Sequence, residues 1–121
     1  MTIRDIDKFI ESLWDWGFLD DCFGDTRIKV TDIDGFVERN GNFLVLETKL
    51  PGNKIPTGQK IMFEKMQKTG LFTIIVVWGN KNDPQEMKVF TPTRQYQKRA
   101  DTSSVRELVT EWFNYANKKV T

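Results

Sequence analysis

The chain has 121 residues, and its 18 Lys and Arg nearly balance its 17 Asp and Glu, which leaves a net charge of +1. This length fits a single domain over residues 1–121, and the charge balance means that any site for a polyanion must be a local patch. The chain has no histidine and one cysteine, Cys22, so histidine-based catalysis, Cys/His zinc sites and an internal disulfide are excluded. Any chemistry must therefore rest on carboxylates and lysines.

The apolar runs of the chain are too short to cross a membrane, and its first residues lack the apolar segment of a signal peptide. A single cysteine also fits a reducing compartment. We therefore expect a cytoplasmic protein that has no membrane partner.

The first third of the chain predicts a helix, a loop and a short strand. Over residues 3–16 the apolar side chains share one broad arc of a helical wheel; they are Ile3, Ile6, Phe9, Ile10, Leu13, Trp14 and Trp16. Residues 17–26 are expected to form a loop that tucks in Phe18, Leu19 and Phe23. Residues 27–30, with the sequence RIKV, are expected to form a strand.

The middle of the chain predicts a β-hairpin and a second helix. Asn40-Gly41 joins two apolar runs and favours a type I′ turn, because both central positions of that turn need a positive φ. Residues 57–69 fit a helix with Thr57 as its N-cap and Gly70 just past its end. The side chains of this helix that we expect to face the core are Ile61, Met62 and Met66.

The last third predicts two strands and a final helix. Residues 71–78, LFTIIVVW, form a continuous apolar run that is typical of a strand buried on both faces, and residues 86–90 fit a further strand. A basic loop is expected to follow, and then a helix from a cap at 101–103 to about Lys118. The apolar stripe of this helix is Val105, Leu108, Val109, Trp112, Phe113 and Ala116. The order of elements predicts a mixed α/β fold with helices covering the sheet.

The Asn-Gly turn fixes the register of the hairpin. If these two residues form the loop, Asp34 faces Glu47 and Asp32 faces Lys49 across the strands. Because successive side chains alternate, Asp34, Glu47 and Lys49 share one face. Two like charges directly opposite each other are destabilising, so something must compensate for them.

A divalent cation between Asp34 and Glu47 would remove this repulsion, and carboxylate oxygens suit Mg²⁺, for which Mn²⁺ can substitute. Lys49 could then orient a water and stabilise negative charge on a phosphate. The alternative is a solvated strand end with one ion pair. Asp32 has two open roles, as a partner of Lys49 or as a member of the metal shell.

The hairpin and the next helix carry a pattern known from nucleases. Asp34-Gly35 is followed by Glu47-Thr48-Lys49 on an apolar strand, and Gln59 then opens a helix. This pattern resembles the PD-(D/E)XK nuclease superfamily, above all its small resolvase-like and VRR-NUC-type members, which phages often encode. The resemblance covers about residues 3–78, and it departs from the pattern at Ile33, where proline is usual. It implies a restriction-endonuclease-like α/β fold, in which an αβββαβ core is followed by a strand and a helix.

The resemblance also implies metal-dependent cleavage of phosphodiester bonds. Asp34 and Glu47 would hold the metal together with the carbonyl group of Thr48, and Lys49 would be the catalytic lysine. Gln59 would point into the site; its alternative role is that of a surface or capping residue.

Many members of that superfamily add an acidic residue from the first helix. Glu11 is our candidate and Asp7 is the alternative; an ordinary solvated carboxylate is the other interpretation of Glu11. A second E-x-K sequence, at residues 86–88, has no hairpin partner, and we interpret it as the surface edge of a strand.

Basic and aromatic residues suggest where nucleic acid binds, because cations neutralise phosphates while a tyrosine ring stacks or donates a hydrogen bond. A charged loop that is merely solvated is the alternative for the stretch TRQYQKRA. The candidates for nucleic-acid binding are Asn53, Lys54, Lys60, Arg94, Tyr96, Lys98 and Arg99.

Together these observations predict a Mg²⁺-dependent endonuclease that acts on DNA, with a preference for branched DNA or junctions. A homodimer that addresses two strands fits the small size of the chain, and the choice between DNA and RNA stays open. The alternative is a non-catalytic protein on the same fold, either a nucleic-acid-binding module or a phage regulatory or anti-defence protein.

Overall fold

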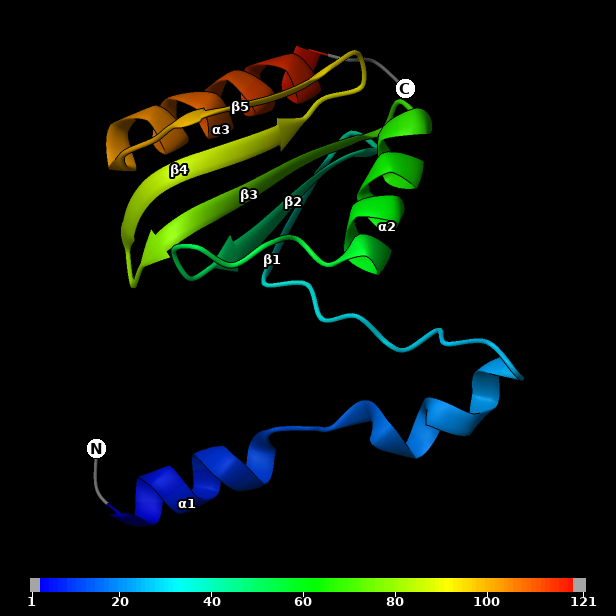
Figure 1. Cartoon of the computed structure of the whole chain (residues 1–121). Helices are drawn as coiled ribbons and strands as arrows, with labels where there is room; N and C mark the ends of the chain where they lie inside the picture. The colour runs from blue at the N-terminus through cyan, green and yellow to red at the C-terminus, as the bar shows by residue number, and fades with distance from the viewer. Residues whose placement is uncertain (1–2, 119–121) are drawn as a thin grey trace. The chain divides into compact units, whose positions relative to one another are not determined.

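The computed structural model of the chain describes residues 3–118, and the chain divides into two units, Met1–Asp32 and Ile33–Thr121 (Figure 1). The first unit contains α1 (Ile3–Ser12) and the 3₁₀ helix η1 (Trp16–Phe23). The predicted helix over residues 3–16 ends early, at Ser12, and Asp15 accepts a hydrogen bond from the backbone N–H of Gly17 at 2.6 Å, which caps a new helix. The expected loop over residues 17–26 contains this second helix.

The first unit has no buried side chain among residues 5–32. Phe18, which was expected to be tucked in, is 63% exposed, whereas Leu19 and Phe23 are half-buried. The predicted strand at 27–30 is wrong, because these residues pair with no strand of the described chain. The apolar arc predicted for residues 3–16 is exposed at every member from Ile6 to Trp16, and the side chain of Ile3 lies outside the described part.

The second unit is built on a five-stranded mixed sheet with the order β1-β2-β3-β4-β5. Only β2 and β3 run parallel, which requires a crossover, and α2 (Thr57–Lys68) supplies it. The last helix, α3 (Thr102–Lys118), follows β5. The strands are β1 (Gly35–Arg39), β2 (Asn42–Lys49), β3 (Phe72–Asn80), β4 (Asp83–Phe90) and β5 (Gln95–Arg99).

The two helices of the second unit cover opposite faces of the sheet (Figure 1). On the α3 face the buried cluster is Leu44, Ile75, Met87, Val89, Trp112 and Ala116. On the α2 face it is Val45, Phe63, Ile74, Val76, Trp78 and Phe90. The prediction that the apolar run in β3 is buried on both faces is confirmed, because Ile74 and Ile75 point to opposite layers and are both fully buried.

Several predicted details of the helices need correction. Ile61 is 52% exposed, and Phe63 fills the core in its place, with its ring 5.7 Å from that of Phe90. Thr57 is the first residue of α2 and makes no capping bond, because Pro56 holds the cap position. Phe113, in the predicted stripe of α3, is 45% exposed.

Two predicted helix ends are confirmed. Gly70 has a φ of +77° just past α2, and its N–H donates to the carbonyl of Gln67 at 3.1 Å. The side chain of Asp101 accepts a hydrogen bond from the backbone N–H of Ser104 at 2.7 Å, which caps α3.

The basic stretch after β4 is a strand and not the expected loop. Residues Gln95–Arg99 form β5 and pair with β4 from Glu86↔Arg99 to Phe90↔Gln95. β4 itself begins at Asp83, because the turn before it needs only two residues and Asn82 adopts a φ of +56°. The E-x-K sequence of β4 thus lies in an inner strand and not at a sheet edge.

Candidate active site

The hairpin turn places the candidate carboxylates. Asn40 and Gly41 have φ values of +52° and +78°, as a type I′ turn requires, and the pairing Arg39↔Asn42 confirms the expected register. The ladder ends at Gly35↔Leu46, so the expected strand pairs Asp34↔Glu47 and Asp32↔Lys49 are not formed. Gly35 matters here, because a Cβ at this position would lie 3.1 Å from the Cβ of Leu46.

Asp34 bends out of the strand and reaches across the start of the ladder. Its Oδ2 accepts a hydrogen bond from the backbone N–H of Thr48 at 2.8 Å and another from the Thr48 hydroxyl at 3.0 Å. Thr48, the residue after Glu47, therefore fixes the orientation of the Asp34 side chain. The carbonyl group of Thr48, the third expected metal ligand, keeps that role as a prediction.

The carboxyl groups of Asp34 and Glu47 do meet, although not as a strand pair. Glu47 is only 6% exposed, and burial together with a hydrogen bond and charge repulsion from Asp34 raises the pKa of Glu47 to about 7. The hydrogen bond with Glu47 lowers the pKa of Asp34, and the bonds from Thr48 lower it further. The pair thus retains one proton at moderately acid pH, and this proton resides on Glu47.

Gln59 completes the surroundings of Glu47. It lies in the first turn of α2, and its Nε2 donates a hydrogen bond of 2.5 Å to Oε2 of Glu47. Its other side-chain atom, Oε1, is buried and has no hydrogen-bond partner among the described residues. A buried carbonyl oxygen of this kind needs a hydrogen-bond donor, and a water or a substrate hydroxyl could supply it.

Lys49 follows Glu47 on the same face of β2, because side chains alternate along a strand. It is half-buried and pairs with Trp78 of β3. Its positive charge opposes the rise in the pKa of Glu47. A cation is therefore close enough to the carboxyl pair to act on it.

The donor set of this pair suits a hard divalent cation, since two carboxyl groups offer oxygen ligands to one region. The described residues contain no group of three His, Cys, Asp or Glu side chains that could hold an ion. Water and substrate oxygens would therefore supply the other ligands, as is usual for Mg²⁺. Glu11 and its alternative Asp7 lie on α1 and, with Asp32, belong to the unit Met1–Asp32, so their roles stay predictions.

The predicted nucleic-acid contacts separate into two groups. Asn53, Lys54, Lys60 and Arg99 line one open pocket of about 1120 Å³. Tyr96 packs against the core on the α3 side, with Arg94 stacked 4.5 Å from its ring centre, and Lys98 lies 5.9 Å from the same ring. The structure therefore does not bring Arg94, Tyr96 and Lys98 together with Glu47.

Sequence reasoning missed two side chains beside the site. Lys88 and Trp78 both line the pocket, and Trp78 donates a hydrogen bond of 2.6 Å from its indole N–H to the carbonyl of Asn53. The alternation Glu86-Met87-Lys88 is the signal that could have found Lys88, because it places Glu86 and Lys88 on one face of a strand.

Comparison of the chain with protein-family models, with curated proteins and with solved structures gives no match. The resemblance to a nuclease superfamily therefore rests on the residues alone. Separately, none of the described helices is both long and apolar enough to span a bilayer.

Proposed function

We propose that the protein is a metal-dependent endonuclease of the PD-(D/E)XK type that hydrolyses phosphodiester bonds in DNA. One observation carries the proposal: the buried carboxyl group of Glu47 lies against the carboxyl group of Asp34 at the end of a hairpin, and the next lysine, Lys49, is on the same face of the strand. A purely structural strand end has no need to bury one carboxyl against another, because that arrangement costs stability.

Each residue has a distinct part in the proposed reaction. Asp34 and Glu47 would hold Mg²⁺, with the carbonyl of Thr48 as the further ligand that the resemblance implies. The ion would supply Lewis acidity at the phosphate and a bound water of lowered pKa.

Lys49 donates hydrogen bonds to a non-bridging phosphate oxygen and so stabilises the charge that grows during in-line attack. Gln59 holds Glu47 through its Nε2, and its unpartnered Oε1 accepts a hydrogen bond from the attacking water and so aligns it. The preference for branched DNA follows from the resemblance only.

A cleavage assay with purified protein tests the proposal. Supercoiled plasmid, single-stranded DNA, a four-way junction and a duplex RNA are each incubated with Mg²⁺, with Mn²⁺ or with EDTA. We expect cleavage only with metal, abolition by Glu47→Ala, and a loss of about 10²–10³-fold for Lys49→Ala.

Matched controls come from exposed residues of the helices. Glu107→Ala on α3 and Lys68→Ala at the end of α2 remove the same charges away from the carboxyl pair and should retain full activity. If wild type and Glu47→Ala behave alike on every substrate, the enzymatic proposal is wrong. If wild type shifts DNA without cutting it, the protein is a binding module on the same fold.

A further inference from the structure

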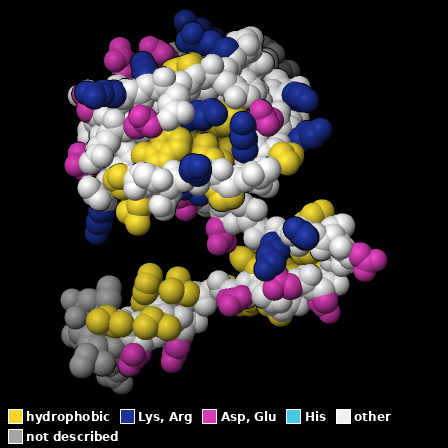
Figure 2. All heavy atoms as spheres, in the orientation of Figure 1, with side chains coloured by type: hydrophobic (Ala, Val, Ile, Leu, Met, Phe, Trp, Pro, Cys, Tyr) yellow, Lys and Arg dark blue, Asp and Glu magenta, His cyan; other side chains and the backbone are white. Residues whose placement is uncertain are grey.

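α2 leaves part of its face of the sheet uncovered. α2 packs over Val45, Ile74 and Phe90, whereas the other end of this face borders the open pocket of about 1120 Å³. Figure 2 shows this side of the second unit, where an apolar area is bordered by Lys and Arg side chains. We call the pocket the sheet groove; its sides are the loop 51–55, the start of α2, and the segment from β5 into α3.

Strand pairing shows that the groove continues the row of residues that holds Lys49. Lys49 pairs with Trp78, Trp78 with Glu86, and Glu86 with Arg99, so one row crosses four strands. The neighbouring row runs from Glu47 through Val76 and Lys88 to Gln97. With about 4.8 Å between strands, the groove extends roughly 14 Å from the strand that carries the carboxyl pair.

The charges of the groove favour an anion. It holds four cations, Lys54, Lys60, Lys88 and Arg99, and within the described residues none of them makes an ion pair. Its two acids, Glu86 and Asp101, leave the groove with a formal balance of +2. Their carboxylates face neutral donors, since Glu86 accepts from the side chain of Gln97 at 2.6 Å and Asp101 caps α3.

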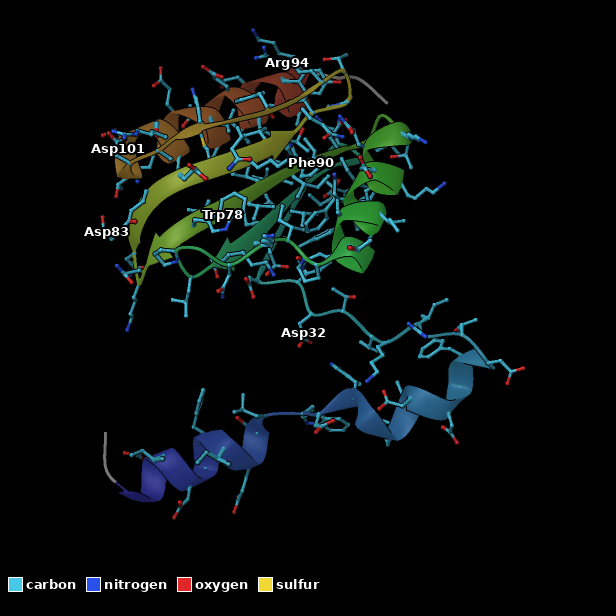
Figure 3. All side chains as sticks on the ribbon, in the orientation of Figure 1. Asp32, Trp78, Asp83, Phe90, Arg94 and Asp101 are labelled. Atoms are coloured by element: carbon cyan, nitrogen blue, oxygen red, sulfur yellow. The ribbon has the colours of Figure 1, made fainter. Side chains whose placement is uncertain are left out.

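The shape favours a polymer over a small ligand. The volume exceeds the usual range of small-molecule pockets, about 300–1,000 Å³, and the groove is open. Trp78 lies in its floor but is only 9% exposed, and its N–H is used by Asn53, so no ring is presented for base stacking. Figure 3 shows Trp78 and Asp101 at the end of the sheet away from Arg94.

We propose that the sheet groove binds the phosphates of the nucleic-acid strand next to the scissile bond, through Lys54 and Lys60 on one side and Lys88 and Arg99 on the other. The proposal deepens the proposed function and rests on it for the position of the scissile bond. Because the groove presents cations and no stacking ring, binding is independent of base sequence.

Fluorescence anisotropy with labelled single-stranded and duplex oligonucleotides, in EDTA and over a range of KCl, tests the groove without cleavage. Two double variants each remove two charges: Lys88→Gln with Arg99→Gln, and Lys54→Gln with Lys60→Gln. We expect each to weaken binding at least tenfold and to reduce the slope of log affinity against log salt by about 1.4 for single strands and 1.8 for duplex.

The matched control is Lys68→Gln with Arg106→Gln, which removes the same charge from the far end of α2 and from α3. It should change the affinity less than twofold, and Arg99→Lys should bind like wild type. Thermal melts check that every variant is folded. An equal loss in the control, or an unchanged salt slope in the groove variants, would overturn the proposal.

The two proposals fail separately. If the groove variants lose binding as expected but wild type cuts no substrate with metal, the groove stands and the nuclease is wrong. If wild type cuts with metal but the groove variants retain both affinity and KM, the nuclease stands and the groove is wrong. Absence of nucleic-acid binding by wild type would overturn the groove directly.

Discussion

At the scale of single residues, the carboxyl pair of Asp34 and Glu47 explains why a charged residue occupies a buried strand position. The cost of burying Glu47 is reduced by its raised pKa, which favours the neutral form, and by the hydrogen bond from the amide of Gln59. The charge of Asp34 is stabilised by two hydrogen bonds, from the backbone N–H and the hydroxyl of Thr48. In the metal-free protein a proton therefore removes the repulsion that the sequence assigned to a cation. Metal binding must displace this proton, which links affinity for metal to pH.

Glu47 should make the metal-free protein less stable as pH rises. Its pKa is raised from 4.5 to about 7, so between these values the native state binds a proton that the unfolded chain has released. Rising pH in this window therefore lowers the free energy of unfolding, by about 1–3 kcal/mol if one pKa unit corresponds to 1.36 kcal/mol. Asp34 acts in the opposite direction but below its ordinary value of 3.8, outside this window.

Urea denaturation in EDTA at pH 5, 6.5 and 8 measures this effect. Glu47→Gln should remove the pH dependence of the free energy of unfolding in this window, because the amide of the new glutamine donates a hydrogen bond to Asp34 at every pH. It should therefore exceed wild type in stability at pH 8. Glu107→Gln, an exposed carboxyl on α3, serves as the control and should follow wild type. Parallel curves for wild type and Glu47→Gln would contradict the shared proton.

At the scale of elements, the hairpin turn determines where the carboxyl pair forms. Gly41 has a φ of +78°, a conformation that costs about 1–2 kcal/mol for a residue with a Cβ. We therefore expect Gly41→Ala to lower the free energy of unfolding by that amount. Asn40 adds a tertiary link, since its Nδ2 donates to the carbonyl of Ala116 in α3 at 3.1 Å.

Gly58→Ala provides the comparison for this prediction. Gly58 lies in the first turn of α2, and a Cβ there would meet nothing within 4 Å. Since alanine is the better helix former, this change should be neutral or stabilise the protein by up to about 1 kcal/mol. Urea denaturation measures the free energy of unfolding of both variants. If Gly41→Ala and Gly58→Ala change it equally, the positive φ of Gly41 imposes no strain on a residue with a Cβ.

The elements that sequence could predict are those with strong local signals. Asn40-Gly41 determined the register and hence the neighbourhood of Asp34 and Glu47, and the unbroken apolar run of β3 indicated an inner strand. β5 could not be found in this way, because Gln95–Arg99 is polar and its strand state depends on pairing with β4. The bend at Asp34 was missed for a similar reason, since only the donors of Thr48 favour leaving the ladder.

At the scale of the whole molecule, the net charge of +1 conceals a separation along the chain. Residues 33–121 carry 14 of the 18 Lys and Arg but nine of the 17 Asp and Glu, so this unit is basic and residues 1–32 are acidic. From the net charge alone we expected that a polyanion could bind only at a local basic patch, and that expectation did not consider how the charges are distributed along the chain. A basic unit that carries the carboxyl pair and the sheet groove has a favourable field for a polyanion.

A chain that begins at Ile33 tests both the domain organisation and the helix acid. All buried side chains among the described residues lie in Ile33–Thr121, so removing residues 1–32 removes none of them. We expect the melting temperature to change by less than about 4 °C, since 1 kcal/mol shifts it by roughly 4–8 °C at this size. A fall of more than about 10 °C would show that the removed segment stabilises the core and that the chain is one cooperative domain. If the shortened chain is folded, its cleavage of DNA with Mg²⁺ tests the acid on α1. Retained cleavage would exclude a required acid on that helix. Lost cleavage would assign this acid to Glu11 if, in the full chain, Glu11→Ala is inactive and Asp7→Ala is active.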